Sequence, residues 1–295
     1  MDKLDAMRQF VRVAELGSFA AAAAQLGVAR SAVTRQVAQL ESHLGSKLML
    51  RSTRRLTLTA AGTAYLEKCR VILNLVEAAE TDIAAESLTP RGTIRIALPL
   101  SFGLSRLAPL LLDFAERYPE VGLDMDYSDR RLKLIDEGID LAVRITRRLE
   151  PGDIARRLGS ARMCLVAAPD YLARHGSPRQ PQDLANHECL GYTAGGGPLP
   201  WQFDVAGQMY SFTPQGRINA GNGDVLNAAV IRGMGIACQP DFIVAPALAA
   251  GQVQSLLDDF PQPELGIYAL LPSNRHIPHR VRVLLDFLAA ALGGV

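Results

Sequence analysis

The sequence predicts a mainly α/β protein with a small helical head at its amino terminus. Before residue 90 the apolar residues recur at intervals of three and four, which is the spacing of amphipathic helices. After Thr89-Pro90-Arg91-Gly92, short apolar runs of strand length alternate with helical patterns, as is typical of α/β units. Residues 1–60 hold nine Lys and Arg against four Asp and Glu, whereas the remainder holds 22 against 26. A basic head on a mildly acidic body indicates a polyanionic partner for the head alone.

The head is expected to begin with three helices. An amphipathic pattern over residues 4–14 predicts a first helix that ends at Gly17, because glycine accepts the left-handed conformation of a helix end. Ser18 is placed to cap a second, alanine-rich helix. A turn at Gly27-Val28 leads to a third helix over residues 29–44. Two helices joined in this way form the helix-turn-helix pattern, whose second helix enters the major groove of DNA.

The third helix and the segment after it carry the candidate DNA contacts. The helix face opposite its apolar residues carries Arg30, Ser31, Thr34 and Arg35. Such a face is by itself explained equally well as a solvated surface. Residues 48–59 then alternate into two short strands around a basic tip at 51–55, which predicts a wing that straddles the phosphate backbone. Helix and wing together favour DNA binding.

The first part of the chain resembles the winged helix-turn-helix of the LysR-type transcriptional regulators. The segments that carry this resemblance are GSFAAAAAQLGVARSAVTRQVAQLESHLG and, after it, KLMLRSTRRLTLTAAG. The resemblance covers residues 1–62 and implies that the amino-terminal part of the third helix reads base edges, while the wing contacts phosphate or the minor groove. The DNA-binding residues that it implies are Arg30, Ser31, Thr34, Arg35, Arg51 and Arg54. Ala29 departs from the family pattern, in which a serine commonly caps this helix.

A long helix is predicted from about residue 60 to residue 87, within a linker at 60–89 that follows a DNA-binding domain at 1–59. One heptad position holds Leu66, Leu73 and Glu80, and another holds Cys69, Val76 and Ile83. Such a seam needs a partner helix, although packing on its own chain would also explain it. The family resemblance implies pairing of subunits into a homodimer or homotetramer. Two recognition helices would then meet half-sites about one DNA turn apart, so the implied partner is double-stranded DNA with an imperfectly palindromic operator.

The body, residues 90–295, is expected to form two lobes around largely parallel sheets. Strand patterns occur at 93–98, 121–127, 140–145, 163–168, 201–205, 209–212, 236–239 and 267–271, and helical patterns at 103–117, 130–137, 170–174, 224–232, 242–249 and 278–292. The last strand and helix repeat the pattern of the first set, so the chain is expected to cross between lobes near 158–161 and 265–267. Lobe I then comprises 91–160 and 267–295, and lobe II comprises 161–266.

Two passages of the body, DRRLKLIDEGIDLAVRI and IYALLPSNRHIPHRVRVLLDFL, resemble the substrate-binding domain of the same family. The resemblance covers nearly all of residues 91–290 and implies a fold like that of periplasmic solute-binding proteins, with an effector cleft between the lobes. Loops after parallel strands line such a crevice, and these loops carry Ser101, Phe102, Ser128, Arg144 and Thr146. The resemblance adds Phe203 and Asn222 in lobe II.

Arg144 is a candidate effector contact, because a guanidinium group pairs with an anionic ligand. A surface salt bridge with Asp129 or Glu150 is the alternative. Ser101 can cap a helix whose free N–H groups attract a carboxylate, and a plain cap without ligand is its alternative. These residues favour a small-molecule effector that is polar or anionic.

Other classes of function lack their sequence signals. No GxSxG, P-loop, GxGxxG or HExxH pattern occurs, so neither a catalytic residue nor an enzyme activity is expected. The widely spaced Cys69, Cys164, Cys189 and Cys238 give no metal site, and no cofactor is expected. The charged amino-terminal segment and the lack of a long apolar run argue against a signal peptide and a membrane span, and so against a transport-type solute-binding protein. The sequence therefore predicts a cytoplasmic transcriptional regulator whose effector shifts the arrangement of its DNA-binding heads.

Overall fold

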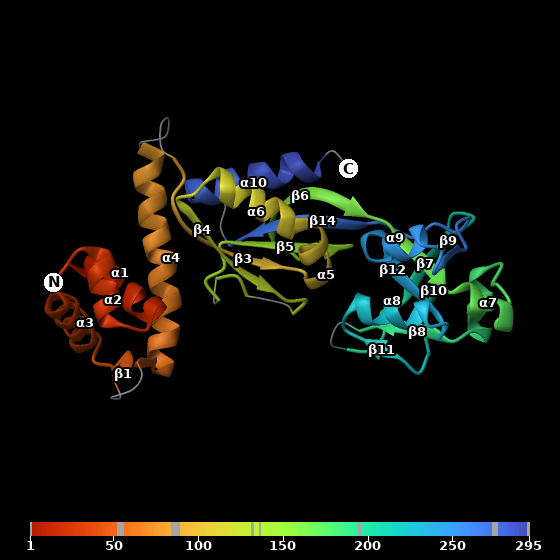
Figure 1. Ribbon diagram of the computed structural model, residues 1–295, viewed down its shortest axis with the longest axis horizontal. Coiled ribbons are helices and arrows are strands. Elements are labelled where there is room, and N and C mark those ends of the chain that lie inside the picture. The colour runs from red at the N-terminus through yellow and green to blue at the C-terminus, as the bar shows by residue number, and fades with distance from the viewer. Residues whose placement is uncertain are drawn as a thin grey trace.

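The computed structural model describes residues 2–51, 56–83, 89–130, 133–135, 137–193, 196–272 and 277–293. A helical head, one long helix and two α/β lobes follow one another along the longest axis of the molecule (Figure 1). The carboxyl-terminal helix lies on the lobe nearer to the long helix, because the chain returns to that lobe after building the other (Figure 1). Within the described ranges, no helix is long and apolar enough to cross a membrane.

The head consists of three helices and a hairpin. Its elements are α1 (Lys3–Leu16), α2 (Phe19–Leu26), α3 (Arg30–Leu44), β1 (Met49–Arg51) and β2 (Leu56–Leu58). Gly17, Gly27 and Gly45 each end a helix in the left-handed conformation. The Ser18 hydroxyl accepts the Ala21 N–H at the start of α2, as the sequence predicts. The expected helix-turn-helix is formed by α2 and α3.

The long helix α4 (Ala60–Ile83) packs on the head through its first turns. Leu66 is 6% exposed and Cys69 is fully buried, and both belong to the apolar core of the head. The first half of the predicted heptad seam is therefore filled by its own chain, which corrects the expectation that these two residues face a partner helix. Ile72 and Leu75, on the next turns, are 37% and 39% exposed. The seam positions beyond residue 76 have side chains outside the described part of the chain.

Lobe I is a five-stranded sheet with helices on one face (Figure 1). Its strands are β3 (Gly92–Leu98), β4 (Val121–Tyr127), β5 (Leu141–Thr146), β6 (Ile154–Ala161) and β14 (Leu265–Leu271), in the order β4-β3-β5-β14-β6. Its helical segments are α5 (Leu100–Phe102), the π-helix η1 (Gly103–Leu107), α6 (Ala108–Arg117) and α10 (His279–Leu292). Phe114 and Leu284 anchor α6 and α10 in the core of the covered face. A smaller cluster around Ala142 and Leu270 forms on the other face.

Lobe II repeats this plan with a sheet in the order β11-β8-β12-β7-β13. Its strands are β7 (Met163–Ala167), β8 (Cys189–Tyr192), β11 (Asn219–Ala220), β12 (Ile236–Pro240) and β13 (Gln254–Leu256), and a separate hairpin contains β9 (Trp201–Val205) and β10 (Gln208–Phe212). Its helical segments are α7 (Pro169–His175), the 3-10 helix η2 (Pro181–Asn186), α8 (Gly223–Ile231) and α9 (Asp241–Ala249). One core lies under α8 and α9, and another lies under α7 and the hairpin.

The strand directions differ from the expectation of largely parallel sheets. In lobe I, β3 runs parallel to β4 and β5, but β14 runs antiparallel to both of its neighbours. In lobe II, β8 runs parallel to β11 and β12, whereas β7 runs antiparallel to β12 and β13. The expectation is wrong for half of these pairings, because the strand that arrives from the other lobe enters each sheet in the opposite direction.

A helix expected at 130–137 is wrong in the part of this segment that is described. The Glu137 N–H donates to the Lys133 carbonyl (3.0 Å) and the Gly138 N–H donates to the Ile135 carbonyl (3.3 Å), which makes a turn. Gly138 has a φ of 60°, and this left-handed conformation prevents the turn from continuing as a helix. The strands β6, β8, β11 and β13 do not stand out in the sequence, because β6 is interrupted by Arg156 and its neighbour and the others are short.

Two crossing segments join the lobes. The first lies at Arg162, between β6 and β7, and the second lies between β13 and β14. The Asp241 N–H of α9 donates to the Arg162 carbonyl (2.8 Å), and the Asp241 carboxylate accepts the Arg162 N–H (3.3 Å). These two hydrogen bonds attach the first crossing segment to the start of α9 in lobe II.

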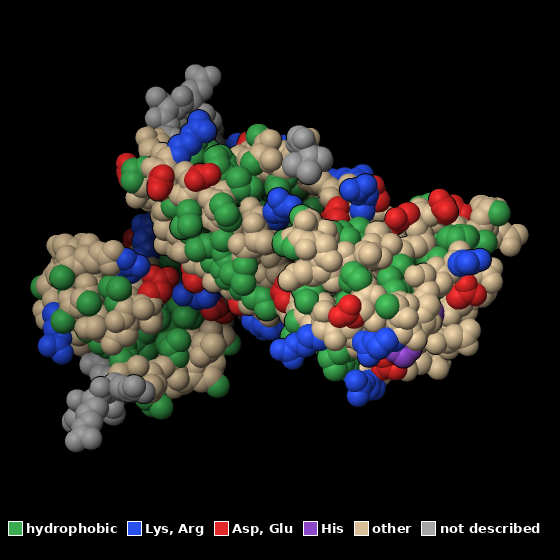
Figure 2. Space-filling model, turned by 45° about the vertical axis from the view of Figure 1, so that its right-hand side comes forward, with side chains coloured by type: hydrophobic (Ala, Val, Ile, Leu, Met, Phe, Trp, Pro, Cys, Tyr) green, Lys and Arg blue, Asp and Glu red, His purple; other side chains and the backbone are tan. Residues whose placement is uncertain are grey.

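Ionic contacts join the head to lobe I through α4. Arg70 on α4 lies 3.4 Å from Glu15 on α1 and 2.8 Å from Glu67. Glu67 lies 3.5 Å from Arg95 on β3, and Arg95 also pairs with Asp124 on β4 at 3.0 Å. We call these five residues the interdomain ion chain. Acidic and basic side chains gather where the head meets the body (Figure 2), while the apolar cores of the two units are separate.

Candidate DNA-binding surface and interlobe cleft

The predicted recognition helix α3 presents a polar surface to solvent. Arg30, Ser31 and Arg35 are exposed and Thr34 is half-buried. The opposite face of the helix is buried in the head core through Val33, Val37 and Leu40. Ala29 precedes the helix in an extended conformation and provides no side-chain cap. The first two turns therefore combine the guanidinium groups of Arg30 and Arg35 with backbone N–H groups that no side chain caps, which suits phosphates and base edges.

Glu41 on α3 fixes the first strand of the hairpin. Its side chain is buried, and Oε1 accepts the Leu48 N–H (2.9 Å) and the Met49 N–H (3.1 Å). Oε2 accepts from the Lys47 ammonium group (2.7 Å). Burial raises the pKa of this carboxyl, but the hydrogen bonds from Lys47, Met49 and Leu48 outweigh burial, so the pKa is lowered. The helical pattern places Glu41 on the polar side of α3, and only the folded hairpin shows why it is buried.

Gly62 allows α4 to lie directly against the hairpin. A Cβ atom at this position would lie 1.9 Å from the Leu48 carbonyl oxygen, so only glycine fits. The Thr59 hydroxyl donates to the Lys47 carbonyl (2.7 Å) and accepts the Gly62 N–H (2.9 Å). The hairpin is thus held by α3 on one side and by the start of α4 on the other.

A groove of about 450 Å³ separates α3 from β1. Its lining residues are Thr34, Ala38, Glu41, Lys47, Met49 and Leu50. Leu50 is 56% exposed at this groove, beside the hairpin tip. Of the predicted wing contacts, Arg51 ends β1 but its side chain is outside the described part of the chain, and Arg54 lies wholly outside it.

Contacts between α5 and lobe II join the two lobes where the sequence predicts the effector cleft. The Ser101 hydroxyl donates to the Asp224 carboxylate in the first turn of α8 (2.5 Å). Phe102 packs edge-on against Phe242 of α9, with the ring centroids 5.0 Å apart. The predicted loop after β3 therefore faces lobe II, and both predicted residues in it contact that lobe.

Two buried amide groups lie beside this bridge. Asn222 caps α8, because its Oδ1 accepts the Asp224 N–H (3.0 Å) and the Val225 N–H (3.2 Å). Gln239, at the end of β12, is 1% exposed, and a Cβ on Gly223 would lie 2.6 Å from its Oε1. The Nδ2 of Asn222 and the Nε2 of Gln239 are buried without a hydrogen-bond partner among the residues that the structure describes. Buried donors of this kind call for an acceptor from a ligand or water.

Phe203 is the clearest error among the predicted effector contacts. It is 1% exposed in the core of lobe II, because alternate side chains of β9 face that core. Its neighbour Gln202 points the other way and accepts a hydrogen bond from Arg147 of lobe I (2.9 Å). The strand therefore meets the opposite lobe through Gln202, which has no distinguishing signal in the sequence.

Ser128 and Thr146 lie at the ends of β4 and β5 with their hydroxyls engaged in local turns. The Ser128 hydroxyl accepts the Arg130 N–H (3.2 Å), and the Thr146 hydroxyl donates to the Arg148 carbonyl (2.9 Å). Asp129, which follows Ser128, accepts the Leu100 N–H (3.0 Å). This carboxylate caps α5, so the alternative interpretation of Ser101 as a plain cap is wrong.

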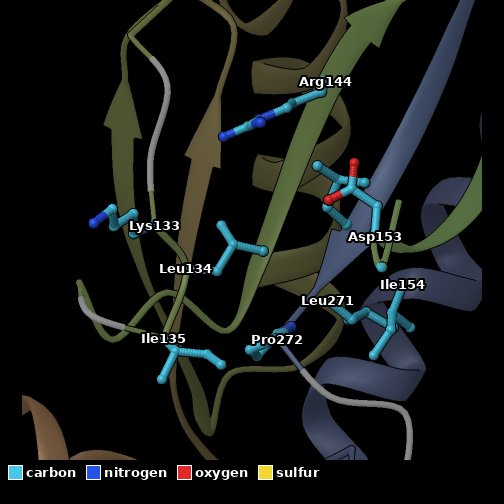
Figure 3. A pocket seen from close by; sticks show the side chains of 10 residues that line it. Lys133, Leu134, Ile135, Arg144, Asp153, Ile154, Leu271 and Pro272 are labelled. Atoms are coloured by element: carbon cyan, nitrogen blue, oxygen red, sulfur yellow. The ribbon is translucent and has the colours of Figure 1, made fainter. Parts of the chain in front are cut away.

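Arg144 lies apart from these residues. Its side chain lines a cavity of about 380 Å³ whose lining residues all belong to lobe I (Figure 3). Arg144 shares a face of β5 with Ala142, which packs against Leu134 of the turn at 133–138. The expectation that Arg144 joins Ser101 in one cleft is therefore wrong, because the pleat directs its side chain beneath that turn.

Metal and thiol chemistry have no arranged site in the described ranges. No group of three His, Cys, Asp or Glu side chains within them is arranged to hold a metal ion. Burial raises the pKa of the Cys69 thiol to about 11, and it raises the pKa of the Cys189 and Cys238 thiols to about 12. Thiols of this kind stay protonated at neutral pH and are poor nucleophiles.

Two family models match this chain, one over the head and one over the two lobes. Residues 4–63 match the family described as "Bacterial regulatory helix-turn-helix protein, lysR family", and residues 88–293 match "LysR substrate binding domain". The HTH-type transcriptional regulator CrgA of Neisseria meningitidis serogroup C (strain 8013) is 38% identical over 289 residues, which cover 96% of this chain and 95% of that protein. The structure of CrgA, a LysR-type transcriptional regulator from Neisseria meningitidis, gives a TM-score of 0.63 at 36% identity and 98% coverage of both chains. The full-length structure of the Vibrio cholerae virulence activator AphB gives a TM-score of 0.60 at 28% identity, covering 98% of this chain and 99% of that chain.

Proposed function

This chain belongs to the LysR family of bacterial transcriptional regulators, and from that premise we propose which of its residues read DNA and which respond to a small molecule. The family brings together a DNA-binding helix-turn-helix and an effector-binding domain, and its members are regulators and not enzymes. The function of the chain is therefore transcription regulation, in which an effector modulates promoter binding.

In our proposal α3 enters the major groove and reads bases with its exposed first turns. The base-reading residues are Arg30, Ser31, Thr34 and Arg35. The observation that carries this assignment is their position on one exposed side of a helix whose other side is buried in the head. A guanidinium group that binds guanine through two hydrogen bonds contributes about 1–3 kcal/mol of discrimination. Arg51 and Arg54 then bind phosphate or the minor groove from the hairpin.

The proposed assembly pairs two subunits through α4. Ile72 and Leu75 are exposed on the turns that follow the head core, and they offer an apolar contact to a second α4. Leu104 and Leu112 of lobe I, 57% and 59% exposed, provide a second apolar surface that would extend a homodimer to a homotetramer. Two recognition helices would meet an imperfectly palindromic operator with half-sites about one DNA turn apart. We propose that the protein is cytoplasmic, because a regulator of this family acts at promoters on the bacterial chromosome.

The proposed effector is a polar or anionic small molecule held between the lobes. Its oxygen atoms would accept hydrogen bonds from the buried Nδ2 of Asn222 and Nε2 of Gln239, two donors that have no partner within the described structure. A ligand at this position competes with the hydrogen bond between Ser101 and Asp224, and so it favours a different angle between the lobes. A coupling free energy of about 1–3 kcal/mol is enough to change promoter occupancy.

Replacing Arg35 with alanine tests the DNA-binding assignment. DNA retained by the protein from its own genome provides the cognate site, and mobility-shift assays at fixed salt compare this site with a random duplex. We expect Arg35→Ala to weaken cognate binding by about 10- to 100-fold and random binding far less, because a base contact is lost. Arg117→Ala is the matched control, since Arg117 is exposed at the end of α6, in lobe I. Equal losses on both duplexes would instead make Arg35 a phosphate contact.

A further inference from the structure

The cavity beside Arg144 is separate from the interlobe cleft. It has a volume of about 380 Å³. It lies between the turn at 133–135 and the ends of β6 and β14 that point away from lobe II (Figure 3). At this end of the sheet Leu270 pairs with Ala142, whereas the cleft end of β5 is Thr146, which pairs with Gly266. Small-molecule sites in proteins usually occupy about 300–1,000 Å³, so the cavity has room for one small ligand.

The lining of this cavity is apolar with cations at its edge. The apolar lining is made by Leu134, Ile135, Ile154, Leu271 and Pro272. Arg144 is half-buried, and its side chain extends across the cavity toward the side where Lys133 lies (Figure 3). Asp153 is the one acidic side chain of the described lining, and its carboxylate already accepts the Glu150 N–H (2.9 Å). The described lining therefore combines apolar surface with two cationic side chains and one acidic side chain.

This combination selects a ligand with two chemical parts. A guanidinium group has five N–H donors, so Arg144 can hold a carboxylate and keep a contact with the protein. The apolar walls favour a hydrocarbon chain or ring attached to that carboxylate, since burial of such a group removes apolar surface from water. We propose that this cavity is a second small-molecule site, specific for amphiphilic monocarboxylates and distinct from the interlobe effector site.

The position of the cavity connects its occupancy to the head. Leu134 and Ile135 belong to the turn whose Glu137 carbonyl accepts a hydrogen bond from Arg95 (3.3 Å). Arg95 is the lobe I residue of the interdomain ion chain that contacts α4, and it lies 3.5 Å from Glu67. A ligand that displaces the turn therefore displaces the group through which lobe I holds the linker helix. This consequence rests on the proposed function of the head as the DNA-binding unit.

Calorimetric titration of the full-length protein with sodium octanoate tests the site without DNA. We expect one octanoate per chain, and at least about tenfold weaker binding of octanamide, which has the same chain without the charge. Arg144→Gln removes the cation and Ile135→Glu places a negative charge at a rim position that is 50% exposed, so each should weaken octanoate binding by at least about tenfold. Ile135→Glu leaves the core intact and so remains informative if Arg144→Gln fails to fold.

Two further variants separate this site from other surfaces. Met209→Glu places the same charge on β10 of lobe II, at a side chain that is 55% exposed and outside the cavity, and it should leave octanoate binding unchanged. Ser101→Ala, in the interlobe cleft, should leave it unchanged as well. The proposal is overturned if octanoate does not bind at millimolar concentration, if octanamide binds as tightly, or if Ser101→Ala weakens binding as much as Ile135→Glu.

The link to the head is tested by a mobility-shift assay with and without octanoate. Octanoate should change the DNA affinity of the wild-type protein and should have a smaller effect on Glu67→Gln, which lacks the carboxylate that pairs with Arg95. An equal effect on both proteins overturns the route through Arg95. Failure of the wild-type protein to bind DNA without octanoate would contradict the proposed function of the head, and the calorimetric result on the cavity would stand by itself.

Discussion

Replacing Glu41 with alanine removes the acceptor that holds the hairpin against α3. The buried N–H groups of Leu48 and Met49 both lose their partner. Each buried donor left unpaired costs about 1–3 kcal/mol, so the two together destabilise the docked hairpin by on the order of 3 kcal/mol. The Lys47 side chain is 74% exposed, and its pairing with Glu41 contributes less than about 1 kcal/mol because solvent screens it.

Glu41→Gln separates the backbone contacts from the charge. Both backbone N–H groups donate to Oε1, whereas the Lys47 ammonium group donates to Oε2. A glutamine therefore keeps a carbonyl oxygen for the backbone and loses only the ion pair. We expect the glutamine variant to destabilise the hairpin by less than about 1 kcal/mol and the alanine variant by about 3 kcal/mol.

Amide hydrogen exchange of a peptide covering residues 47–51 measures this difference in the full-length protein. Intrinsic fluorescence does not serve, because the one tryptophan of the chain, Trp201, lies in the core of lobe II. A loss of about 3 kcal/mol corresponds to roughly 100-fold faster exchange through local opening. Equal acceleration in both variants would refute the argument from backbone acceptors and assign the effect to the charge. Unchanged exchange in the alanine variant would show that other contacts hold the hairpin.

Three other outcomes follow from the same structure. Gly62→Ala should weaken DNA binding, since its Cβ would meet the Leu48 carbonyl oxygen at 1.9 Å and displace the hairpin, and unchanged affinity in a mobility-shift assay would contradict this. Ser101→Ala removes the hydroxyl that donates to Asp224, so the lobes should separate further in solution scattering while DNA binding without effector persists; an unchanged scattering profile would count against the bridge. Because the pKa of Glu41 is lowered from 4.5, the part of its stabilisation that depends on charge, less than about 1 kcal/mol, is present above pH 4.5 and is lost as the pH falls through the folded value. The protection of residues 47–51, corrected for intrinsic exchange, should therefore fall by less than about fivefold there in the wild type and show no such step in Glu41→Gln.

The head could be predicted from sequence because its signals are local. Gly17, Gly27 and Ser18 mark helix ends within a few residues of the elements they limit, and the polar face of α3 follows from helical periodicity alone. The burial of Glu41 could not be predicted in this way, because its partners belong to a hairpin seven and eight residues further along the chain. Most of the wrong predictions therefore concern residues whose partners are distant in the sequence.

The residues between the lobes show the same contrast between local signals and distant partners. Ser101 lies where the loop after β3 places it, but its partner Asp224 is 123 residues away and has no sequence signal that connects the two. Phe203 and Arg144 both depend on which face of a strand is turned to the core, and a short strand such as β9 leaves that choice open until its neighbours are known. Gln239 did have a signal, since a polar residue ends the apolar run of β12.

The interdomain ion chain has a consequence for measurements of DNA affinity. Its members are between 16% and 59% exposed, so dissolved salt reaches them. Raising the ionic strength from about 0.15 M to 1 M shortens the Debye length from about 8 Å to about 3 Å and weakens exposed ion pairs. The same change weakens phosphate contacts through the release of counterions. The salt dependence of operator binding therefore has an intramolecular part, and its slope overstates the number of phosphates that the protein neutralises.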